Sequence, residues 1–296
     1  MGGIFGTDGI RGTTGFGDSS ELLLTPEFVL QIGRAVGMYV RANDSLSKHK
    51  VVIGRDTRSS GVMLEYAITA GLLAQGIDVL SVDVVPTAAV PFLVRHFDAK
   101  LGIMLTASHN PADDNGIKFF GADGYKLYEN GERFIEQVIS ENSTYSQVET
   151  TSLGRVENAE SYQKAYIEYL LKAGIDLSGV TVVLECANGA TSYVAPEVFR
   201  RLGANVHTLN STPNGININD SYEYLDPVTL RDRVIQIGAD VGFAFDGDGD
   251  RVVMINASGD ILDGDDILAL LAIAMNQQGR LPHSTIATTN MSNLGL

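Results

Sequence analysis

The chain has 296 residues and a mass of 31.7 kDa, enough for about two domains of ~150 residues that each bury a core. Hydrophobic residues make up 44% and charged residues 19% of it, which excludes an intrinsically disordered chain. Thirty-six acidic and 21 basic side chains leave a net charge of −15, and this field repels nucleic acids and anionic membrane surfaces. We therefore expect neither nucleic acid nor a membrane as a partner.

The sequence favours a cytoplasmic location. Its single cysteine, Cys186, cannot form an intramolecular disulfide, which fits a reducing compartment. The N-terminal residues lack the basic and apolar segments of a signal peptide. The longest apolar run, residues 267–275, is nine residues long, far short of the ~20 that a membrane-spanning helix needs.

The predicted elements begin with a helix that has Thr25 as its N-cap and Pro26 in its first turn. Short apolar runs rich in β-branched residues, which we expect to be strands, then alternate with helical stretches, one of which ends at Gly76. The clearest of these predicted strands are followed by polar loops. The predicted strands of this first unit are residues 51–53, 77–82 and 102–105. This alternation is typical of an α/β fold with mostly parallel sheets.

The same alternation returns after a polar connection at residues 136–151. The second unit has predicted strands at residues 180–184, 205–209 and 241–245 and helices at 194–202 and 228–237. A third unit begins with a helix at 262–275 and a strand at 285–288. The sequence thus predicts repeated β-α-β units in domains at 1–154 and 155–256, followed by the beginning of a third domain at 257–296.

Three carboxylates follow the strand predicted at residues 241–245. They are Asp246, Asp248 and Asp250. The glycines between them let the backbone fold so that all three side chains converge, and hard oxygen ligands of this kind suit Mg²⁺. An ordinary turn is the alternative. An EF-hand calcium loop is excluded, because Arg251 stands where that loop needs glycine and Ala257 where it needs glutamate.

A second loop, which follows the strand at 102–105, contains Ser108, His109 and Asn110 and continues into residues 114–118. Adjacent serine and histidine side chains diverge and make no hydrolase pair, and no Gly-x-Ser-x-Gly elbow surrounds the serine. A serine that carries a phosphoryl group between turnovers needs less activation. Alone, such a turn is most often structural; its pairing with the carboxylate loop favours a phosphoryl carrier.

The N-terminal segment 5–12, FGTDGIRG, is a third candidate site. It matches neither the dinucleotide-binding nor the P-loop glycine pattern, so we expect a loop in which Arg11 either contacts a phosphate or is surface. The other cations near polar strand ends are Arg55, Arg58, Lys118 and Arg251.

Together these loops resemble the α-D-phosphohexomutase family. The matching motifs lie at residues 5–12, 107–111, 114–120, 188–190, 246–251 and 291–295. The first and last of them select the bacterial phosphoglucosamine mutase branch. The resemblance implies reversible transfer of phosphate between the 6 and 1 positions of glucosamine phosphate through a bisphosphate, for UDP-N-acetylglucosamine synthesis. Mannose or glucose phosphate is the alternative substrate within the family, and relatives are often homodimers.

The resemblance also implies roles for individual residues. Ser108 is carried as phosphoserine, and Mg²⁺ is held by a phosphoserine oxygen with Asp246, Asp248 and Asp250. Lys118 and His109 serve proton transfer and electrostatic support. The phosphosugar and its transferring group are contacted by Arg11, Asn110, Lys118 and Arg251.

The chain also departs from the family pattern. Residues 219–226 replace a small-residue loop, and the role of Tyr222 and Tyr224 there is open. Residues 111–114 differ from the usual aromatic after the proline. The sugar-reading and phosphate-clamping loops of the family's third and fourth domains are absent from the sequence, so we expect a fragment with little or no mutase activity alone, or a non-catalytic one.

A different enzyme class remains open as well. Asp246-x-Asp248 after an apolar strand also matches the nucleophile motif of haloacid-dehalogenase-type phosphatases, which form a phosphoaspartate. The two hypotheses differ in the residue that becomes phosphorylated, Ser108 or Asp246.

Overall fold

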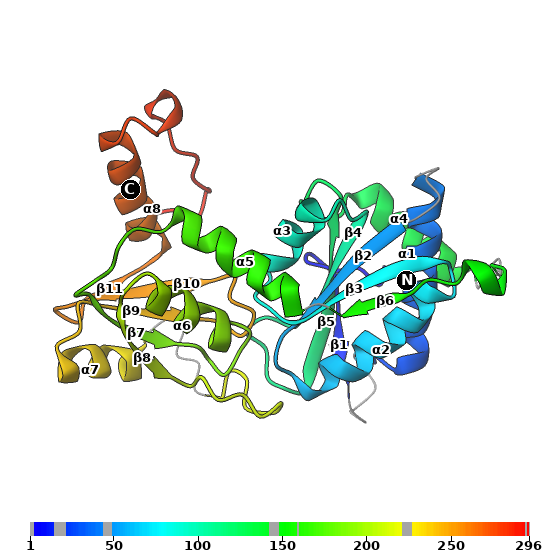
Figure 1. Cartoon of the computed structure of the whole chain (residues 1–296), viewed down its shortest axis with the longest axis horizontal. Helices are drawn as coiled ribbons and strands as arrows, with labels where there is room; N and C mark the ends of the chain where they lie inside the picture. Colours follow the sequence, from blue (N-terminus) through cyan, green and yellow to red (C-terminus); the bar gives the residue numbers. More distant parts are fainter. Residues whose placement is uncertain are drawn as a thin grey trace.

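The computed structural model of the chain describes residues 3–14, 22–43, 49–141, 148–158, 160–220, 227–293 and 295. It has two α/β lobes, each built on one sheet (Figure 1). The predicted α/β class with repeated β-α-β units is confirmed. Tyr222 and Tyr224 lie outside the described residues.

The sheet of the first lobe has six strands in the order β1-β5-β4-β2-β3-β6. Its strands are β1 (Ile10–Thr13), β2 (His49–Arg55), β3 (Ile77–Val84), β4 (Leu101–Leu105), β5 (Asp114–Gly121) and β6 (Val156–Asn158). β2, β3, β4 and β6 are parallel, whereas β5 runs antiparallel to both β4 and β1. β1 and β5 correct the sequence prediction, which treated both segments as loops; their glycines and polar residues resemble turns, but each strand pairs with the other.

Helices cover both faces of this sheet. They are α1 (Pro26–Asn43), α2 (Ser59–Leu73), α3 (Ala89–His96) and α4 (Glu129–Ser140). Val51 and Ile53 of β2 pack with α1, α2 and α4, and the intervening Val52 packs with α3 on the other face. The predicted cap of α1 is confirmed, because the Phe28 amide donates to Thr25 Oγ1 at 3.2 Å.

The sheet of the second lobe has the order β11-β10-β9-β7-β8. Its elements are β7 (Thr181–Glu185), α6 (Thr191–Arg201), β8 (Asn205–Leu209), α7 (Val228–Ile237), β9 (Val241–Phe245), β10 (Val252–Asn256) and β11 (Ile261–Leu262). β7, β8 and β9 are parallel, and β10 and β11 are antiparallel to their neighbours. α6 packs on one face and α7 on the other.

The two lobes share part of a core through α5 (Glu160–Ala173), which lies between them in Figure 1. Tyr166 and Ile167 of α5 pack with buried residues of both α3 and α6. The boundary expected at residue 155 falls just before β6, and β6 belongs to the first sheet.

The last part of the chain forms α8 (Gly264–Gln277), which projects from the second lobe (Figure 1). The helix is capped by Asp263, whose side chain accepts from the Asp265 and Asp266 amides, but none of its described residues is buried. Two short 3-10 turns, Thr150–Ser152 and Pro282–Ser284, complete the described elements. The strand predicted at residues 285–288 is wrong: this β-branched segment has no described strand beside it to pair with.

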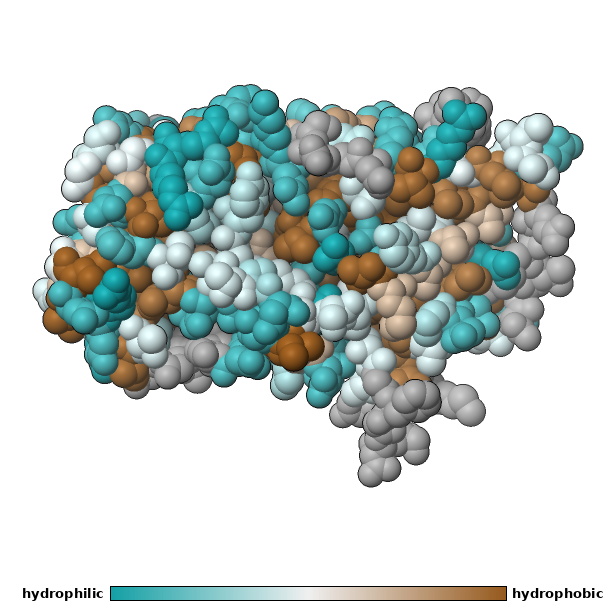
Figure 2. Space-filling model, turned by 60° about the horizontal axis from the view of Figure 1, so that its bottom comes forward, coloured by the Kyte–Doolittle hydropathy of each residue, from teal (hydrophilic) through white to brown (hydrophobic). Residues whose placement is uncertain are grey.

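Within the described part of the chain, no helix combines the length and apolar character that spanning a lipid bilayer requires. On the face drawn in Figure 2, hydrophilic and hydrophobic residues are interspersed over both lobes.

Candidate active site

The two loops singled out in the sequence meet between the lobes. Residues 106–113 follow β4 of the first sheet, and residues 246–251 follow β9 of the second. Ser108 Oγ donates a hydrogen bond to Asp246 Oδ2 at 2.7 Å. Both loops stand at carboxyl ends of strands, where α/β proteins bind their ligands.

The three carboxylates of the second loop converge as predicted. One oxygen from each of Asp246, Asp248 and Asp250 lies within 4.8 Å of the others. Burial, and then the charges of Asp248 and Asp250, raises the pKa of Asp246 to about 7. Asp248 Oδ1 is buried without a hydrogen-bond partner among the described residues, although unpaired buried oxygens are costly. These converging oxygens therefore fit a divalent cation.

Lys118 reaches this cluster from β5. Its Nζ lies 2.8 Å from Asp248 Oδ2, 3.0 Å from Asp250 Oδ2 and 3.2 Å from Asp8 Oδ2. Burial acts to lower the pKa of Lys118, but the carboxylates outweigh it and the pKa is raised, so the side chain is an ammonium at neutral pH. Burial likewise acts to raise the pKa of Asp248, and Lys118 outweighs it and lowers that pKa. Asp8 was not predicted at the site.

Asp248 is also held from the first lobe. Thr87 Oγ1 donates to Asp248 Oδ2 at 2.7 Å, and the Thr87 amide donates to the Asp248 carbonyl oxygen at 2.9 Å. Two first-lobe groups, the Thr87 hydroxyl and the Lys118 ammonium, therefore hold the Asp248 carboxylate, and the Thr87 amide holds its backbone.

The side chains of His109 and Asn110, which follow Ser108, contact different parts of the site. His109 Nδ1 lies 3.1 Å from Arg251 Nη1, and because a guanidinium only donates, Nδ1 is the acceptor and any imidazole proton is on Nε2. Burial, then the charges of Arg251 and Arg11, lowers the pKa of His109, which favours neutral imidazole. Asn110 Nδ2 instead donates to Asp114 Oδ2 at 2.9 Å, within its own loop.

Arg11 lies at a cavity of about 840 Å³ beside this cluster. The cavity is lined by residues 3–9, Arg11, Leu22 and Arg251. The half-exposed Arg11 side chain is 4.0 Å from Asp8 Oδ2. Two guanidinium groups beside one open cavity are suited to an anionic ligand.

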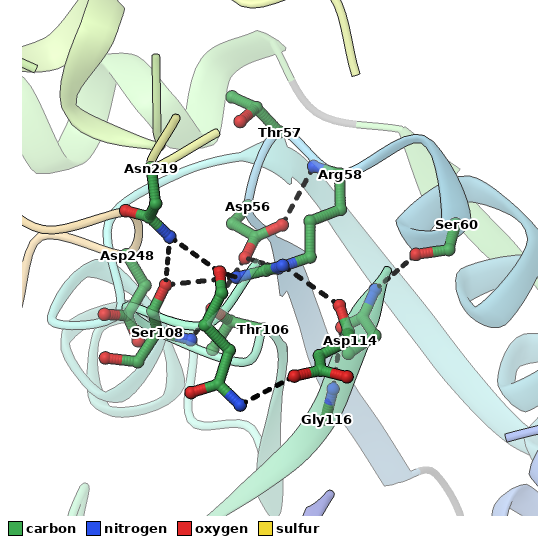
Figure 3. Close-up of polar contacts among 12 residues, drawn as sticks. Asp56, Thr57, Arg58, Ser60, Thr106, Ser108, Asp114, Gly116, Asn219 and Asp248 are labelled. Atoms are coloured by element: carbon green, nitrogen blue, oxygen red, sulfur yellow. Dashed lines mark hydrogen bonds and ion pairs between the residues drawn. The ribbon is translucent and has the colours of Figure 1, made fainter. Parts of the chain in front are cut away.

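The buried pair Asp56 and Arg58 is the part of the site to which the sequence assigned no role. Arg58 Nε lies 2.9 Å from Asp56 Oδ2, and both side chains are fully buried. The guanidinium also donates to four backbone carbonyls of the serine loop and β5 (Figure 3). Those acceptors are the carbonyl oxygens of Ser108, Asn110, Pro111 and Asp114. The sequence signal was the GRDTR run directly after the strand at 51–53.

A relay of hydrogen bonds extends from this pair to Ser108. Thr106 Oγ1 donates to Asp56 Oδ2 at 2.7 Å and accepts from the Ser108 amide at 2.9 Å. Burial raises the pKa of Asp56, against the opposing effect of Arg58. These contacts hold Ser108 at a φ of 54°, a left-handed conformation that is costly for a residue other than glycine.

Two domains of one protein family match the chain, and each of the two loops that meet at the site lies in one of them. Residues 2–146 match phosphoglucomutase/phosphomannomutase α/β/α domain I, and residues 164–259 match α/β/α domain II. The chain belongs to the phosphoglucomutase/phosphomannomutase family, the α-D-phosphohexomutases. The family membership expected from the motifs is confirmed.

Proteins with similar sequences are found in several bacteria. Over 295 residues the chain is 47% identical to a phosphoglucosamine mutase of Pseudomonas paraeruginosa, covering 99% of this chain and 64% of that protein. It is 46% identical to a phosphoglucosamine mutase of Anoxybacillus flavithermus, covering 100% of this chain and 65% of the relative. A family member of known structure from Burkholderia thailandensis has a TM-score of 0.79 at 28% identity, over 93% of this chain and 59% of that one. The chain therefore spans just under two thirds of these curated relatives.

Proposed function

We propose that this chain carries the phosphoserine and metal sites of a phosphoglucosamine mutase, which interconverts glucosamine 6-phosphate and glucosamine 1-phosphate. The observation that carries the proposal is the contact of Ser108 Oγ with Asp246 inside a cluster of three carboxylates. Identities of 47% and 46% to phosphoglucosamine mutases favour glucosamine phosphate over mannose or glucose phosphate.

In this proposal, Asp246, Asp248 and Asp250 hold Mg²⁺ together with an oxygen of phosphorylated Ser108. Bound there, Mg²⁺ neutralises negative charge on the phosphoryl oxygens. The Lys118 ammonium contacts Asp248 and Asp250, so it would add positive charge beside the phosphoryl group on Ser108.

The proposed reaction has two phosphoryl transfers. First the bond between phosphorus and Ser108 Oγ breaks, a bond from phosphorus to the free sugar hydroxyl forms, the hydroxyl proton passes to a base, and Ser108 Oγ takes up a proton as it leaves. The resulting sugar bisphosphate reorients and transfers its other phosphoryl group to Ser108 Oγ. In this second transfer the Ser108 hydroxyl gives up its proton, and the sugar oxygen that is released takes one up. Arg11 and Arg251, at the cavity beside the cluster, would bind the anionic sugar phosphate, with Asn110 supporting the loop beneath it. His109, on the same loop as Ser108, would assist at the sugar hydroxyl.

The remaining features are proposed on the same basis. The protein would work in the cytoplasm as a homodimer, with domains at 1–154, 155–256 and from 257 onward. Since the chain spans 64% and 65% of the two mutases, we expect phosphate uptake on Ser108 with little or no complete turnover by the 296 residues alone.

Intact-protein and peptide mass spectrometry test the proposal. The chain is incubated with Mg²⁺ and a hexose 1,6-bisphosphate, and we expect one acid-stable phosphoryl group on Ser108. Ser108→Ala must abolish it, whereas Ser140→Ala, at the end of α4, must not. An acid-labile adduct on Asp246 would contradict the mutase and favour the phosphoaspartate phosphatase.

A further inference from the structure

We propose that Asn219, in the second lobe, is a positioning residue that holds the phosphoserine loop of the first lobe against the carboxylate loop. The inference rests on the proposed function, because it concerns the placement of Ser108 for phosphoryl transfer. Asn219 lies between β8 and α7. It is the first residue of the segment 219–226 that departs from the family pattern, and the sequence assigned it no role.

The Asn219 side chain crosses from one lobe to the other. Its Nδ2 donates to the carbonyl oxygens of Ser108 and Asn110, both at 2.9 Å. The same two oxygens accept from Arg58 Nη2, at 3.1 Å and 2.9 Å. Figure 3 shows Asn219 and Arg58 approaching the serine loop from different sides. Each of these two carbonyl oxygens of the serine loop therefore accepts from one donor of each lobe.

The orientation of the Asn219 amide follows from chemistry. Carbonyl oxygens accept only, so the NH₂ end of the amide must face them. The backbone of Asn219 is held as well, because its amide donates to the Ala187 carbonyl oxygen at 2.9 Å. Its φ of 61° is a left-handed conformation that asparagine adopts more readily than most residues.

Asn219 also lies directly against the carboxylate loop. A Cβ on Gly247, between Asp246 and Asp248, would lie 2.8 Å from Asn219 Nδ2 and 2.7 Å from the Ser108 carbonyl oxygen. The backbone of the carboxylate loop, the Asn219 amide and the Ser108 carbonyl are thus packed without room for one methyl group. A change at Asn219 would therefore move Ser108 relative to Asp246.

This placement has a kinetic consequence. Ser108 has a left-handed backbone that its surroundings must maintain. Without the Asn219 donor, the carbonyl oxygens of Ser108 and Asn110 are held only from the first lobe, by Arg58. A displacement of about 1 Å between reacting groups can cost on the order of 10²-fold in rate. Loosening of the loop should therefore slow phosphoryl transfer to Ser108.

The test uses two substitutions of Asn219 and one matched control in the same segment. Asn219→Asp replaces the donor by a carboxylate that repels the two carbonyl oxygens, and Asn219→Gly removes the side chain at a φ that glycine accepts. Asn217→Asp is the matched control: it makes the same charge change, and Asn217 Nδ2 donates only within its own segment, to the Thr212 carbonyl oxygen at 3.1 Å.

Two readouts are measured on the full chain. Amide hydrogen exchange reports the opening of residues 106–111, and mass spectrometry follows the phosphorylation rate of Ser108 by a hexose 1,6-bisphosphate at saturating Mg²⁺. We expect both Asn219 variants to accelerate exchange in this loop and to slow phosphorylation by about tenfold or more. Asn217→Asp should change both readouts by less than about twofold, since the hydrogen bonds described for the Asn217 side chain join it to Thr212 and Asn214 of its own segment.

The outcomes separate this inference from the proposed function. If both Asn219 variants match Asn217→Asp in both readouts, or if phosphorylation slows while loop exchange is unchanged, the positioning role is wrong. If the loop loosens in the Asn219 variants but the unsubstituted chain takes no phosphate on Ser108, the positioning role stands and the proposed function fails.

Discussion

Ser108 Oγ and Asp246 Oδ2 lie 2.7 Å apart although the two residues are 138 positions apart and belong to different sheets. Asp246 Oδ1 accepts from the amides of Asp250 and Arg251 at 3.1 Å and 3.2 Å, so its own loop orients the carboxylate. Ser108 is oriented through Thr106 and Arg58 in the first lobe, and Asn219 of the second lobe also donates to its carbonyl oxygen. The site therefore depends on how the two preformed loops dock.

Asp246→Asn should weaken cation binding by the carboxylate cluster. The substitution keeps the side-chain shape and removes one of three converging charges, and one carboxylate facing a cation contributes several kcal/mol in a partly buried site. We expect the affinity for Mn²⁺, measured by titration calorimetry, to fall by about 100-fold or more. Asp232→Asn, on the exposed side of α7, makes the same change in net charge and should leave the affinity unchanged. An equal loss in both variants would assign the effect to overall charge.

The parts of the fold that were predictable are those with buried apolar runs. Val51, Val52 and Ile53 alternate between the two faces of a covered strand, so a continuous apolar run signals a strand with helices on both sides. β1 and β5 were not predictable in this way, because they combine glycine with the charged residues Arg11 and Lys118, which point to the site. A strand also needs a neighbouring strand to pair with, and residues 285–288, three of which are β-branched, have none among the described strands.

The residues of the candidate site likewise divide into those that the sequence predicted and those that it did not. Ser108 and the three aspartates lie in short local motifs, and their residue types state their chemistry. Arg58 and Asn219 instead donate to backbone carbonyl oxygens far away in the sequence. Ser108, whose carbonyl oxygen accepts from both, lies 50 positions from Arg58 and 111 positions from Asn219. Every residue has a carbonyl oxygen, so such acceptors leave no pattern in the sequence.

Arg58→Lys should destabilise the first lobe strongly. A lysine ammonium is a compact point charge and cannot reproduce the planar fork that contacts Asp56 and four carbonyl oxygens at once. Leaving a fully buried carboxylate poorly paired costs about 3–5 kcal/mol in the free energy of unfolding. Urea denaturation would measure this loss in the free energy of unfolding. The control is Arg133→Lys, whose exposed partner is Glu129, and there we expect less than about 1 kcal/mol. Similar values for the two variants would contradict a buried clamp.

Gly189→Ala should disturb the contact between two loops of the second lobe. A Cβ at residue 189 would lie 2.3 Å from the Gly247 carbonyl oxygen, which also accepts from the Ala190 amide at 2.8 Å. Relief of this clash must move the carboxylate loop, so we expect a loss of about 1–3 kcal/mol of stability together with weaker Mn²⁺ binding. Gly264→Ala is the control, since a Cβ there meets nothing within 4 Å. If Mn²⁺ affinity is unchanged in Gly189→Ala, the loop does not depend on this close approach.

Cys186 should be unreactive in the folded protein. Burial raises the pKa of its thiol to about 12, and Sγ lies 3.9 Å from the Leu184 carbonyl oxygen beneath α6. Only about one thiol in 10⁴ is then ionised at pH 8, against roughly a quarter for an unperturbed thiol with a pKa near 8.5. We expect a disulfide reagent to label the native chain at least about 100-fold more slowly than the urea-unfolded chain or free glutathione at the same pH. Because the sequence has one cysteine, labelling reports the opening of this core alone. Native labelling at a rate close to that of glutathione would mean that the space between β7 and α6 opens readily to solvent.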